Sequence, residues 1–320
     1  MVTEYPCHEP SGSTMRIKWE LEALKRNGFS QISIIDKFNK NSIKPNDCLF
    51  HAQQLSGRFL KKKSYISDLH GIAFEEMWHK SFQYPLHSWK RWGFRTKSHL
   101  VKKMEENTWK NALHLICASD IIYDRVKNVQ GATVVRNSVK IDDYPTTKGD
   151  ELKVAVVGPF LPGTQNYQAL DLIRYCVKNL TDIEFVFIGS TNEYFKENLK
   201  FSNSTFLGKV ENYIETLSTC NVLLSPYPES SYLTACPTKM LEAGACQMTV
   251  VTNESGARGS PDNLFLVGKS KNDLVNKLLD LKDENTRKTY GKKIRSEIEK
   301  NYNSDVEIKK LIKLYRELLN

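Results

Sequence analysis

The residues best suited to chemistry stand where short apolar runs end. His70, in the segment SDLHG, follows a predicted strand and has Asp68 and Gly71 around it. Loops at the carboxyl ends of strands in α/β sheets contact ligands, which favours a functional role. A histidine after a strand is also often a structural residue, so both interpretations stay open.

The segment PTKMLEAGA predicts an anion-binding helix. Pro237 and Thr238 precede an apolar helical run, and Thr238 is the expected N-cap. Free N–H groups at a helix N-terminus attract phosphate. Glu242 lies one turn further on, where a carboxylate can accept hydrogen bonds from two vicinal hydroxyls, and Ala243 and Gly244 suit a tightly packed site. The alternative is a solvated glutamate on an ordinary helix.

These positions need a scaffold, and the second half of the chain predicts one. Apolar, β-branched runs alternate there with segments of helical periodicity, which is typical of βαβ units and a parallel sheet. The expected strands are 152–158, 183–189, 221–227, 248–253 and 263–268, and the expected helices between them are 166–180 and 238–245. We therefore predict a Rossmann-like domain.

The first half is less regular. Its expected strands are the short run MVTEYP, 31–36, 48–53, 63–71, 113–119 and 133–139. The segment MRIKWELEALKRNGF predicts an amphipathic helix that ends at Gly28. Residues 72–112 form a mainly helical excursion.

Domain limits follow from composition. Pro, Gly and polar residues cluster at 144–152, so we expect domains at 1–147 and 148–320. Residues 271–320 predict charged helices. The last helix, about 304–320, is expected to pack back on the domains.

Composition bounds the function. The chain has 320 residues, and residues 1–150 hold 24 Lys and Arg against 16 Asp and Glu, whereas the remainder holds 22 against 21. A basic first half suggests that this half meets an anionic surface or substrate. The seven cysteines are an odd count without a CxxC pair, which indicates neither a disulfide framework nor a zinc site. With no signal peptide or apolar span in evidence, we expect a cytoplasmic protein.

The order of segments resembles one family over nearly the whole chain, the family 4 (group 1) retaining glycosyltransferases. The matching segments are an SGS loop before the first helix, DLHG, ICAS, VVRNSV, VVGPFLPGTQN, FIG, TFLGKV, LLSPYPES and PTKMLEAGA. The resemblance implies a GT-B fold, in which two Rossmann-like domains with parallel sheets face each other across a cleft.

The resemblance also implies an activity. A family member transfers a sugar from a nucleotide-diphosphate donor to an acceptor glycan or lipid-linked glycan, with retention. The donor binds the second domain and the acceptor the first. Helix dipoles stabilise the departing diphosphate, so neither a metal ion nor a cofactor is expected, and the sequence has no DxD motif.

Site residues follow from the matching motifs. The resemblance implies that Glu242 holds the ribose, that the diphosphate sits at Thr238, and that His70, with Asp68, contacts the donor sugar as the catalytic residues. Gly12, in the loop before the first helix, would let the backbone approach the donor, unless it is an ordinary turn. Further donor-binding positions implied by the motifs are Gly158, Asn166 and Val210.

The sequence departs from the family in its cations. Pro159 and Gln165 stand where the family has an arginine and a lysine that bind the diphosphate. Lys239, Arg258 or Arg136 could substitute, and Lys239 is the best placed. Thr234 replaces the first of two carboxylates that family members often carry here.

Two alternatives stay open. A catalytically silent nucleotide-sugar-binding subunit would explain the lost cations and the lost carboxylate. A nucleotide-sugar 2-epimerase shares the GT-B fold but needs acid–base carboxylates that the sequence does not identify.

The segment 84–103 mixes aromatic and basic side chains. This composition suits an anionic membrane surface or a lipid-phosphate or polyanionic acceptor. Peripheral attachment to the inner face of the cell membrane would follow. The alternative is a helix whose tryptophans pack inward. No nucleic-acid-binding module is recognisable, so nucleic acid is not an expected partner.

Overall fold

The computed structural model describes residues 1, 12–29, 32, 34, 49–60, 63–147 and 151–319. The chain forms two compact units: Met1–Asn137 with Ser304–Asn320, and Ser138–Asn303. The boundary between the two units, at Asn137/Ser138, precedes the domain boundary expected at 147/148. The expected boundary stays a prediction for the functional domains. The strands expected in MVTEYP and over 31–36 fall on segments outside the described residues.

The first unit is built on a parallel sheet. Its strands, in the spatial order β1-β2-β3-β4, are β1 Phe50–Gln53, β2 Tyr65–Leu69, β3 His114–Cys117 and β4 Ala132–Val134. Four of the expected strands are thereby confirmed. All residues of β1 and β2 are buried, as expected for parallel strands covered on both faces.

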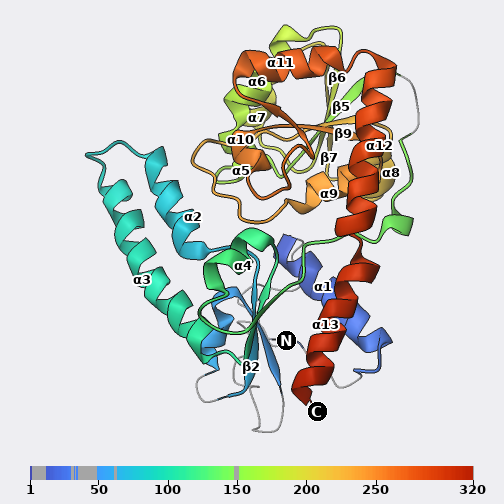
Figure 1. Ribbon diagram of the computed structural model, residues 1–320. Helices are drawn as coiled ribbons and strands as arrows, with labels where there is room; N and C mark the ends of the chain where they lie inside the picture. The colour runs from blue at the N-terminus through green and yellow to red at the C-terminus, as the bar shows by residue number, and fades with distance from the viewer. Residues whose placement is uncertain are drawn as a thin grey trace. The chain divides into compact units, whose positions relative to one another are not determined.

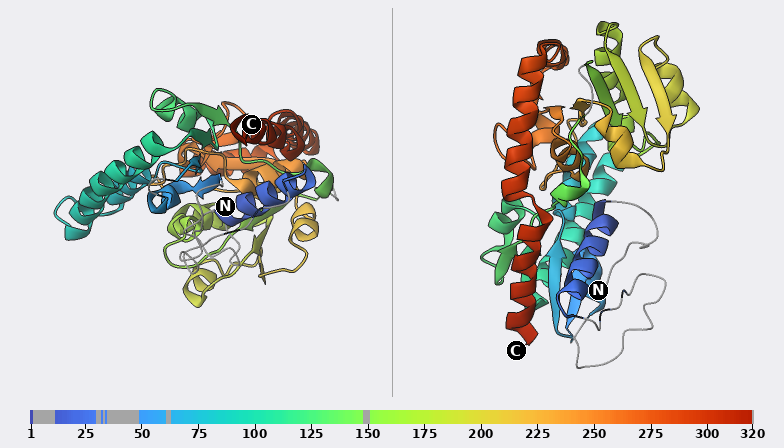
Figure 2. Two further views of the ribbon diagram at one scale, coloured as in Figure 1. Left: turned by 90° about the horizontal axis from the view of Figure 1, so that it is seen from below. Right: turned by 90° about the vertical axis from the view of Figure 1, so that its right-hand side faces the viewer.

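Helices α1 and α13 cover the same part of this sheet, although they come from opposite ends of the sequence (Figure 1; Figure 2, right). Leu24 of α1 and Leu311 of α13 join Ile66 and Ile116 in one apolar cluster. The helices of this unit are α1 Gly12–Arg26, η2 Gln54–Phe59, α2 Ala73–Lys80, η3 Ser81–Gln83, α3 Trp89–Asn111, α4 Asp120–Val126 and α13 Ser304–Leu319. Gly12 is therefore the first residue of α1, and its expected place in a loop is wrong.

The helical excursion expected over 72–112 is a hairpin. Helices α2 and α3 run side by side, and their connection lies far from the sheet of the same unit (Figure 1; Figure 2, left). Glu105 of α3 fixes the base of the hairpin by accepting hydrogen bonds from the N–H groups of Ala73 and Phe74, at 3.0 and 2.9 Å.

The second unit contains a six-stranded parallel sheet of order β10-β9-β8-β5-β6-β7. The strands are β5 Lys153–Val157, β6 Glu184–Ile188, β7 Ser204–Gly208, β8 Val222–Leu224, β9 Thr249–Asn253 and β10 Leu266–Gly268. The five expected strands are confirmed. Strand β7 was not expected, because it is an edge strand with alternating exposure and only a short apolar pattern.

Helices cover both faces of this sheet. Along β5, Val154 and Val156 face one apolar cluster and Ala155 and Val157 face the other, as the two-residue period of a strand requires. The helices are η4 Ile141–Asp143, α5 Gln165–Gln168, α6 Leu170–Asn179, α7 Glu193–Asn198, α8 Tyr213–Ser218, α9 Thr238–Ala245, α10 Glu254–Ala257, α11 Lys271–Asp280 and α12 Glu284–Asn301. The helix expected over 166–180 is divided into α5 and α6 at Ala169. None of the described helices is long and apolar enough to cross a bilayer.

The packing of α12 gives a stability prediction. A Cβ atom at Gly291 would lie 2.2 Å from the backbone oxygen of Gln247, whose own φ is +63°. Because a backbone atom cannot rotate away, Gly291→Ala should lower the free energy of unfolding by about 1–3 kcal/mol. Urea unfolding followed by circular dichroism measures this change.

Gly93, inside α3, is the matched control. Nothing lies within 4 Å of the position that a Cβ atom would take there. Gly93→Ala should therefore raise stability by about 0.8–1.0 kcal/mol through helix propensity. A Gly291→Ala variant as stable as the wild type would contradict the close approach described above.

Candidate active site

The N-terminus of α9 has no cap. Pro237 precedes the helix with φ −64° and ψ 132° and supplies no side-chain hydrogen bond. Thr238 is the first helical residue, so its expected role as the N-cap is wrong. The N–H groups of Thr238 and Lys239 meet no acceptor in the part of the chain that the structure describes. This helix start is therefore available to an anion.

The Lys239 side chain joins α9 to the end of β5. Its ammonium group donates to the Asn166 side-chain oxygen at 2.8 Å and to the Val157 carbonyl at 3.3 Å. Asn166 is buried and also donates to the Val157 carbonyl at 2.9 Å. The ring of Tyr227 lies 5.0 Å below the lysine nitrogen. Lys239 and Asn166, both expected at the donor site, are thus brought together at the carboxyl edge of the sheet.

No carboxylate among the described residues pairs with Lys239. Burial lowers the pKa of Lys239 to about 7, because a low dielectric disfavours the charged amine. An anion bound beside it would supply the missing countercharge and raise its pKa again.

The loop after β5 has a packing constraint. A Cβ atom at Gly158 would lie 2.6 Å from the Phe160 ring, and one at Gly189, where φ is +134°, would lie 2.9 Å from the Gly158 oxygen. Gly158 thus leaves room for the Phe160 ring in its own loop, and Gly189 allows the next loop to pack closely against Gly158. Pro159 and Gln165 are both exposed, and neither brings a cation to this edge.

Glu242 lies on α9 and accepts a hydrogen bond from the Tyr213 hydroxyl at 3.0 Å. Burial raises the pKa of Glu242, and the Tyr213 hydrogen bond opposes that rise. Only one of the two carboxylate oxygens is used by Tyr213, so the carboxylate retains acceptor positions for ligand hydroxyls. Val210, also expected at the donor site, is half-buried against the apolar cluster that includes Tyr213.

Arg258 and Arg136 are the other cations that could replace the family's arginine and lysine, and their environments differ from that of Lys239. Arg258 is exposed, donates to the Ser231 carbonyl at 2.9 Å, and lies over the Tyr232 ring. The charge of Arg258 is therefore available to a ligand at the carboxyl edge of the sheet, in the segment after β9. Arg136 belongs to the first unit and pairs with Asp120 at 2.6 Å, so its charge is already compensated.

In the first unit, His70 and Asp68 lie together at the end of β2. The Nε2 atom of His70 is 3.3 Å from the Asp68 carboxylate, whereas its Nδ1 atom is buried and has no hydrogen-bond partner in the structure. Asp68 is completely buried. It can orient the His70 ring but cannot itself approach a substrate.

A buried arginine holds Asp68. The Arg16 guanidinium donates two hydrogen bonds of 3.0 Å to the two Asp68 oxygens, and it also lies 3.0 Å from Glu20. Burial alone would raise the pKa of Asp68, but the Arg16 charge and the interactions with His70 and His51 together outweigh it and hold this pKa well below its usual range. Burial, with the Asp68 charge beside it, raises the pKa of Glu20 well above its usual value.

One group of side chains has the composition of a metal site. Glu20, His51 and Asp68 each place one ligand atom within 4.8 Å of the others. The Arg16 guanidinium already compensates the carboxylate charge, and a divalent cation beside it would be repelled. These residues therefore do not fit a metal, and the expected absence of one stays a prediction.

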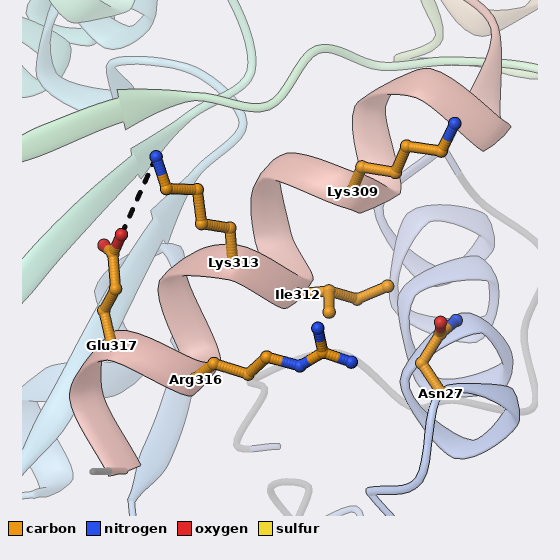
Figure 3. A pocket seen from close by; sticks show the side chains of 6 residues that line it. All are labelled: Asn27, Lys309, Ile312, Lys313, Arg316 and Glu317. Atoms are coloured by element: carbon orange, nitrogen blue, oxygen red, sulfur yellow. Dashed lines mark ion pairs between the residues drawn. The ribbon is translucent and has the colours of Figure 1, made fainter.

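A hollow of about 330 Å³ lies between α1 and α13 (Figure 3). Its lining residues are Asn27, Lys309, Ile312, Lys313, Arg316 and Glu317. Arg316 extends from α13 toward α1, and Glu317 pairs with Lys313 at 3.8 Å. The lining of this hollow contains none of the residues expected at the donor site or at the sugar contact.

Solved structures share this fold. The Anabaena protein HepE in complex with UDP-glucose matches with a TM-score of 0.71 and 12% identity, over 99% of this chain and 98% of that one. WaaG, a glycosyltransferase involved in lipopolysaccharide biosynthesis, matches with a TM-score of 0.64 and 12% identity, over 97% and 96% of the two chains. Sucrose-phosphate synthase from Thermosynechococcus elongatus matches with 0.65 and 18% identity, over 84% and 73%. The fold is that of the GT-B glycosyltransferases.

The sequence of the second unit matches a family directly. Residues 152–284 match the family described as Glycosyl transferases group 1. This part of the chain is thus a glycosyl transferases group 1 domain, as the motifs indicated. Comparison with curated protein sequences finds no match.

Several residues near the candidate site were not expected from the sequence. Tyr213 and Tyr227 contact Glu242 and Lys239, and Arg16 holds Asp68. Their sequence separations from these partners follow no motif. For Arg16 the sequence offered one signal, which is that a basic residue stands near the start of the first predicted helix.

The buried amine gives a pH prediction. Lys239 has a pKa of about 7 in the folded protein and an ordinary value of 10.5 when unfolded. Between these values the unfolded state binds more protons, so stability must rise with pH. The wild type should gain about 1.4 kcal/mol per pH unit over Lys239→Met between about pH 7 and pH 9. Urea unfolding of ligand-free protein at several pH values measures the difference.

The exposed Lys209 is the control, and Lys209→Met should differ from the wild type by the same amount at every pH. A difference between wild type and Lys239→Met that is constant with pH would show that the amine does not titrate near neutrality.

Proposed function

We propose that this glycosyltransferase uses a nucleoside-diphosphate sugar as donor and a glycan or lipid-linked glycan as acceptor, with retention and without a metal ion or cofactor. The observation that carries the proposal is the pairing of two unsatisfied positive features at one sheet edge. These are the uncapped start of α9 and the Lys239 ammonium group, which has no carboxylate partner among the described residues.

A diphosphate suits these features. Its negative oxygens would accept from the N–H groups of Thr238 and Lys239, and the Lys239 side chain would add a charge. Lys239 then takes over the role of the family cations missing at Pro159 and Gln165, with Arg258 as a second, exposed cation. Asn166 positions the Lys239 amine, at 2.8 Å.

The nucleoside end of the donor is assigned to Glu242. Its free carboxylate oxygen can accept from the ribose hydroxyls while Tyr213 holds the other oxygen. Val210 and Gly158 contribute backbone and apolar surface near these groups. The complex of HepE with UDP-glucose supports a donor of this kind for a chain of the same fold.

In the first unit we assign the donor-sugar contact to His70. With Asp68 accepting from Nε2–H, its Nδ1 atom is left as a hydrogen-bond acceptor for a sugar hydroxyl. Asp68 orients this ring, and Gly12, at the start of α1, would let the backbone approach a ligand closely. Retention rests on the family resemblance.

For location, we propose the cytoplasm, with attachment to the inner face of an anionic membrane and a lipid-linked acceptor there. The group 1 domain favours transfer over the silent-subunit alternative. Product analysis with one nucleotide sugar separates transfer, with its anomeric configuration read by NMR, from 2-epimerisation.

Glu242 provides the first test of the donor site. Glu242→Ala should weaken binding of UDP or GDP, whichever binds the wild type, by about 1.5–3 kcal/mol, the range for a hydrogen bond to a charged group. Isothermal titration calorimetry measures this loss. With the matching 2′-deoxy nucleotide the loss should be smaller, because one of the hydroxyl contacts is already absent.

Tyr213→Phe is the control, since it removes the neighbouring hydroxyl and keeps the carboxylate. This variant should retain most of the affinity. Unchanged nucleotide affinity in Glu242→Ala would reject the ribose assignment.

Metal removal tests the phosphate site. Nucleotide binding and transfer should persist in EDTA, because the α9 dipole and Lys239 are expected to balance the diphosphate charge. In contrast, Lys239→Met should weaken binding of the diphosphate more than binding of the nucleoside. A strict requirement for Mn²⁺ or Mg²⁺ would contradict this mechanism.

A further inference from the structure

The connection between α2 and α3 exposes an unusual amount of apolar surface. Four large apolar side chains within residues 82–92 are about half exposed or more: Phe82 (46%), Leu86 (68%), Trp89 (78%) and Trp92 (56%). We call residues 82–97 the hairpin tip. The tip lies at the end of the hairpin that is remote from the sheet of the first unit (Figure 1). Trp89 and Trp92 are therefore exposed to solvent. The alternative interpretation of the sequence, in which the tryptophans pack inward, is wrong for these two residues.

The hairpin tip is also strongly cationic. From Met77 to Met104 the sequence contains seven Lys and Arg and no Asp or Glu. Of these cations, Lys102 pairs with Glu106 at 3.8 Å. The ion pairs among the described residues include neither Lys90 and Lys97 nor Arg91 and Arg95. The tip thus carries positive charge that no part of the described chain compensates.

The cations and the aromatic rings are placed together. The Arg95 guanidinium lies 4.7 Å from the Trp78 ring centre and 5.3 Å from that of Trp92, and the Lys90 nitrogen lies 5.8 Å from that of Trp89. Stacking of Tyr84 on Phe94, at 5.6 Å and 12°, stiffens the loop beneath them. The aromatic rings and the cationic groups of the hairpin tip are therefore close neighbours.

This combination determines the kind of partner. Tryptophan rings favour the boundary between headgroups and acyl chains, and basic residues are attracted to anionic lipid phosphates. A second copy of the chain is disfavoured, because two tips of the same charge repel each other. A nucleic acid would neutralise the cations but would leave the exposed Leu86 without an apolar environment.

We infer that the hairpin tip docks into the interfacial layer of an anionic phospholipid membrane, with Leu86 and Trp89 below the headgroups and Lys90 and Lys97 on lipid phosphates. A hollow of about 360 Å³, lined by Tyr84, Trp89, Lys90, Gly93, Phe94 and Lys97, is the place for one such phosphate. The inference rests on the membrane location in the proposed function and is independent of the transfer reaction.

The test is vesicle co-sedimentation of the full chain without any sugar nucleotide. The wild type should sediment with vesicles of phosphatidylcholine mixed with phosphatidylglycerol, and not with phosphatidylcholine alone. Binding should weaken as salt rises above about 0.15 M, where the screening length is about 8 Å. Tryptophan emission should shift to the blue on binding and be quenched by brominated acyl chains.

Two double variants separate the contributions of charge and apolar surface. Lys90→Ser with Lys97→Ser should weaken binding about 30-fold, since each basic residue near an anionic surface contributes about 1 kcal/mol. Leu86→Ser with Trp89→Ser should remove the quenching by brominated chains. These side chains are exposed and donate no hydrogen bond within the described chain, so both variants should fold.

Matched controls lie in the second unit. Lys200→Ser with Lys209→Ser makes the same change in net charge, and Tyr194→Ser with Leu207→Ser removes comparable exposed apolar surface. Both controls should bind vesicles as the wild type does. A wild type that stays in the supernatant with anionic vesicles at low salt would overturn the inference, as would equal binding by the tip variants or retention by single-stranded RNA instead of lipid. Loss of nucleotide binding in Lys239→Met with vesicle binding intact would concern the donor site alone.

Discussion

A lone ammonium group inside the second unit is the constraint on which the candidate site depends. Lys239 is held by the Asn166 amide oxygen and the Val157 carbonyl, which are dipoles and not charges. Burial of a cation among dipoles is unfavourable, and its lowered pKa reflects this. The same contacts join the start of α9 to the end of β5, so the strand, the helix and the anion-binding groups are positioned together.

In the first unit, by contrast, the buried charged side chains are paired with one another. Arg16 pairs with both oxygens of Asp68, and its guanidinium also lies 3.0 Å from Glu20. The charge is therefore compensated internally, and Nδ1 of His70 is among the buried polar atoms that have no hydrogen-bond partner in the described chain. Such an atom discriminates by hydrogen bonding and not by charge, which suits the recognition of an uncharged group such as a sugar hydroxyl.

Much of the fold could be predicted from the sequence, because buried parallel strands and amphipathic helices leave local periodic patterns. The strand β7 left only a weak pattern, since its residues alternate between half-buried and exposed and none is fully buried. Lys239 could be identified because its segment matches a family motif and because two usual cations are missing. The pairing of Arg16 with Asp68 could not, since 52 residues separate them and each type is common on surfaces. The N-cap assignment of Thr238 failed because residue type alone does not show which residue leaves helical geometry.

The position of α13 at the end of the sequence affects the order in which the two units can fold. Ile308, Leu311 and Tyr315 complete the apolar cluster that covers the first unit's sheet, yet they follow the whole second unit in the chain. Domains generally fold as units during synthesis, beginning at the N-terminus. Here the second unit, a continuous segment, can close its core while the first still lacks a helix. During translation, part of the sheet of the first unit therefore stays uncovered until α13 has left the ribosome.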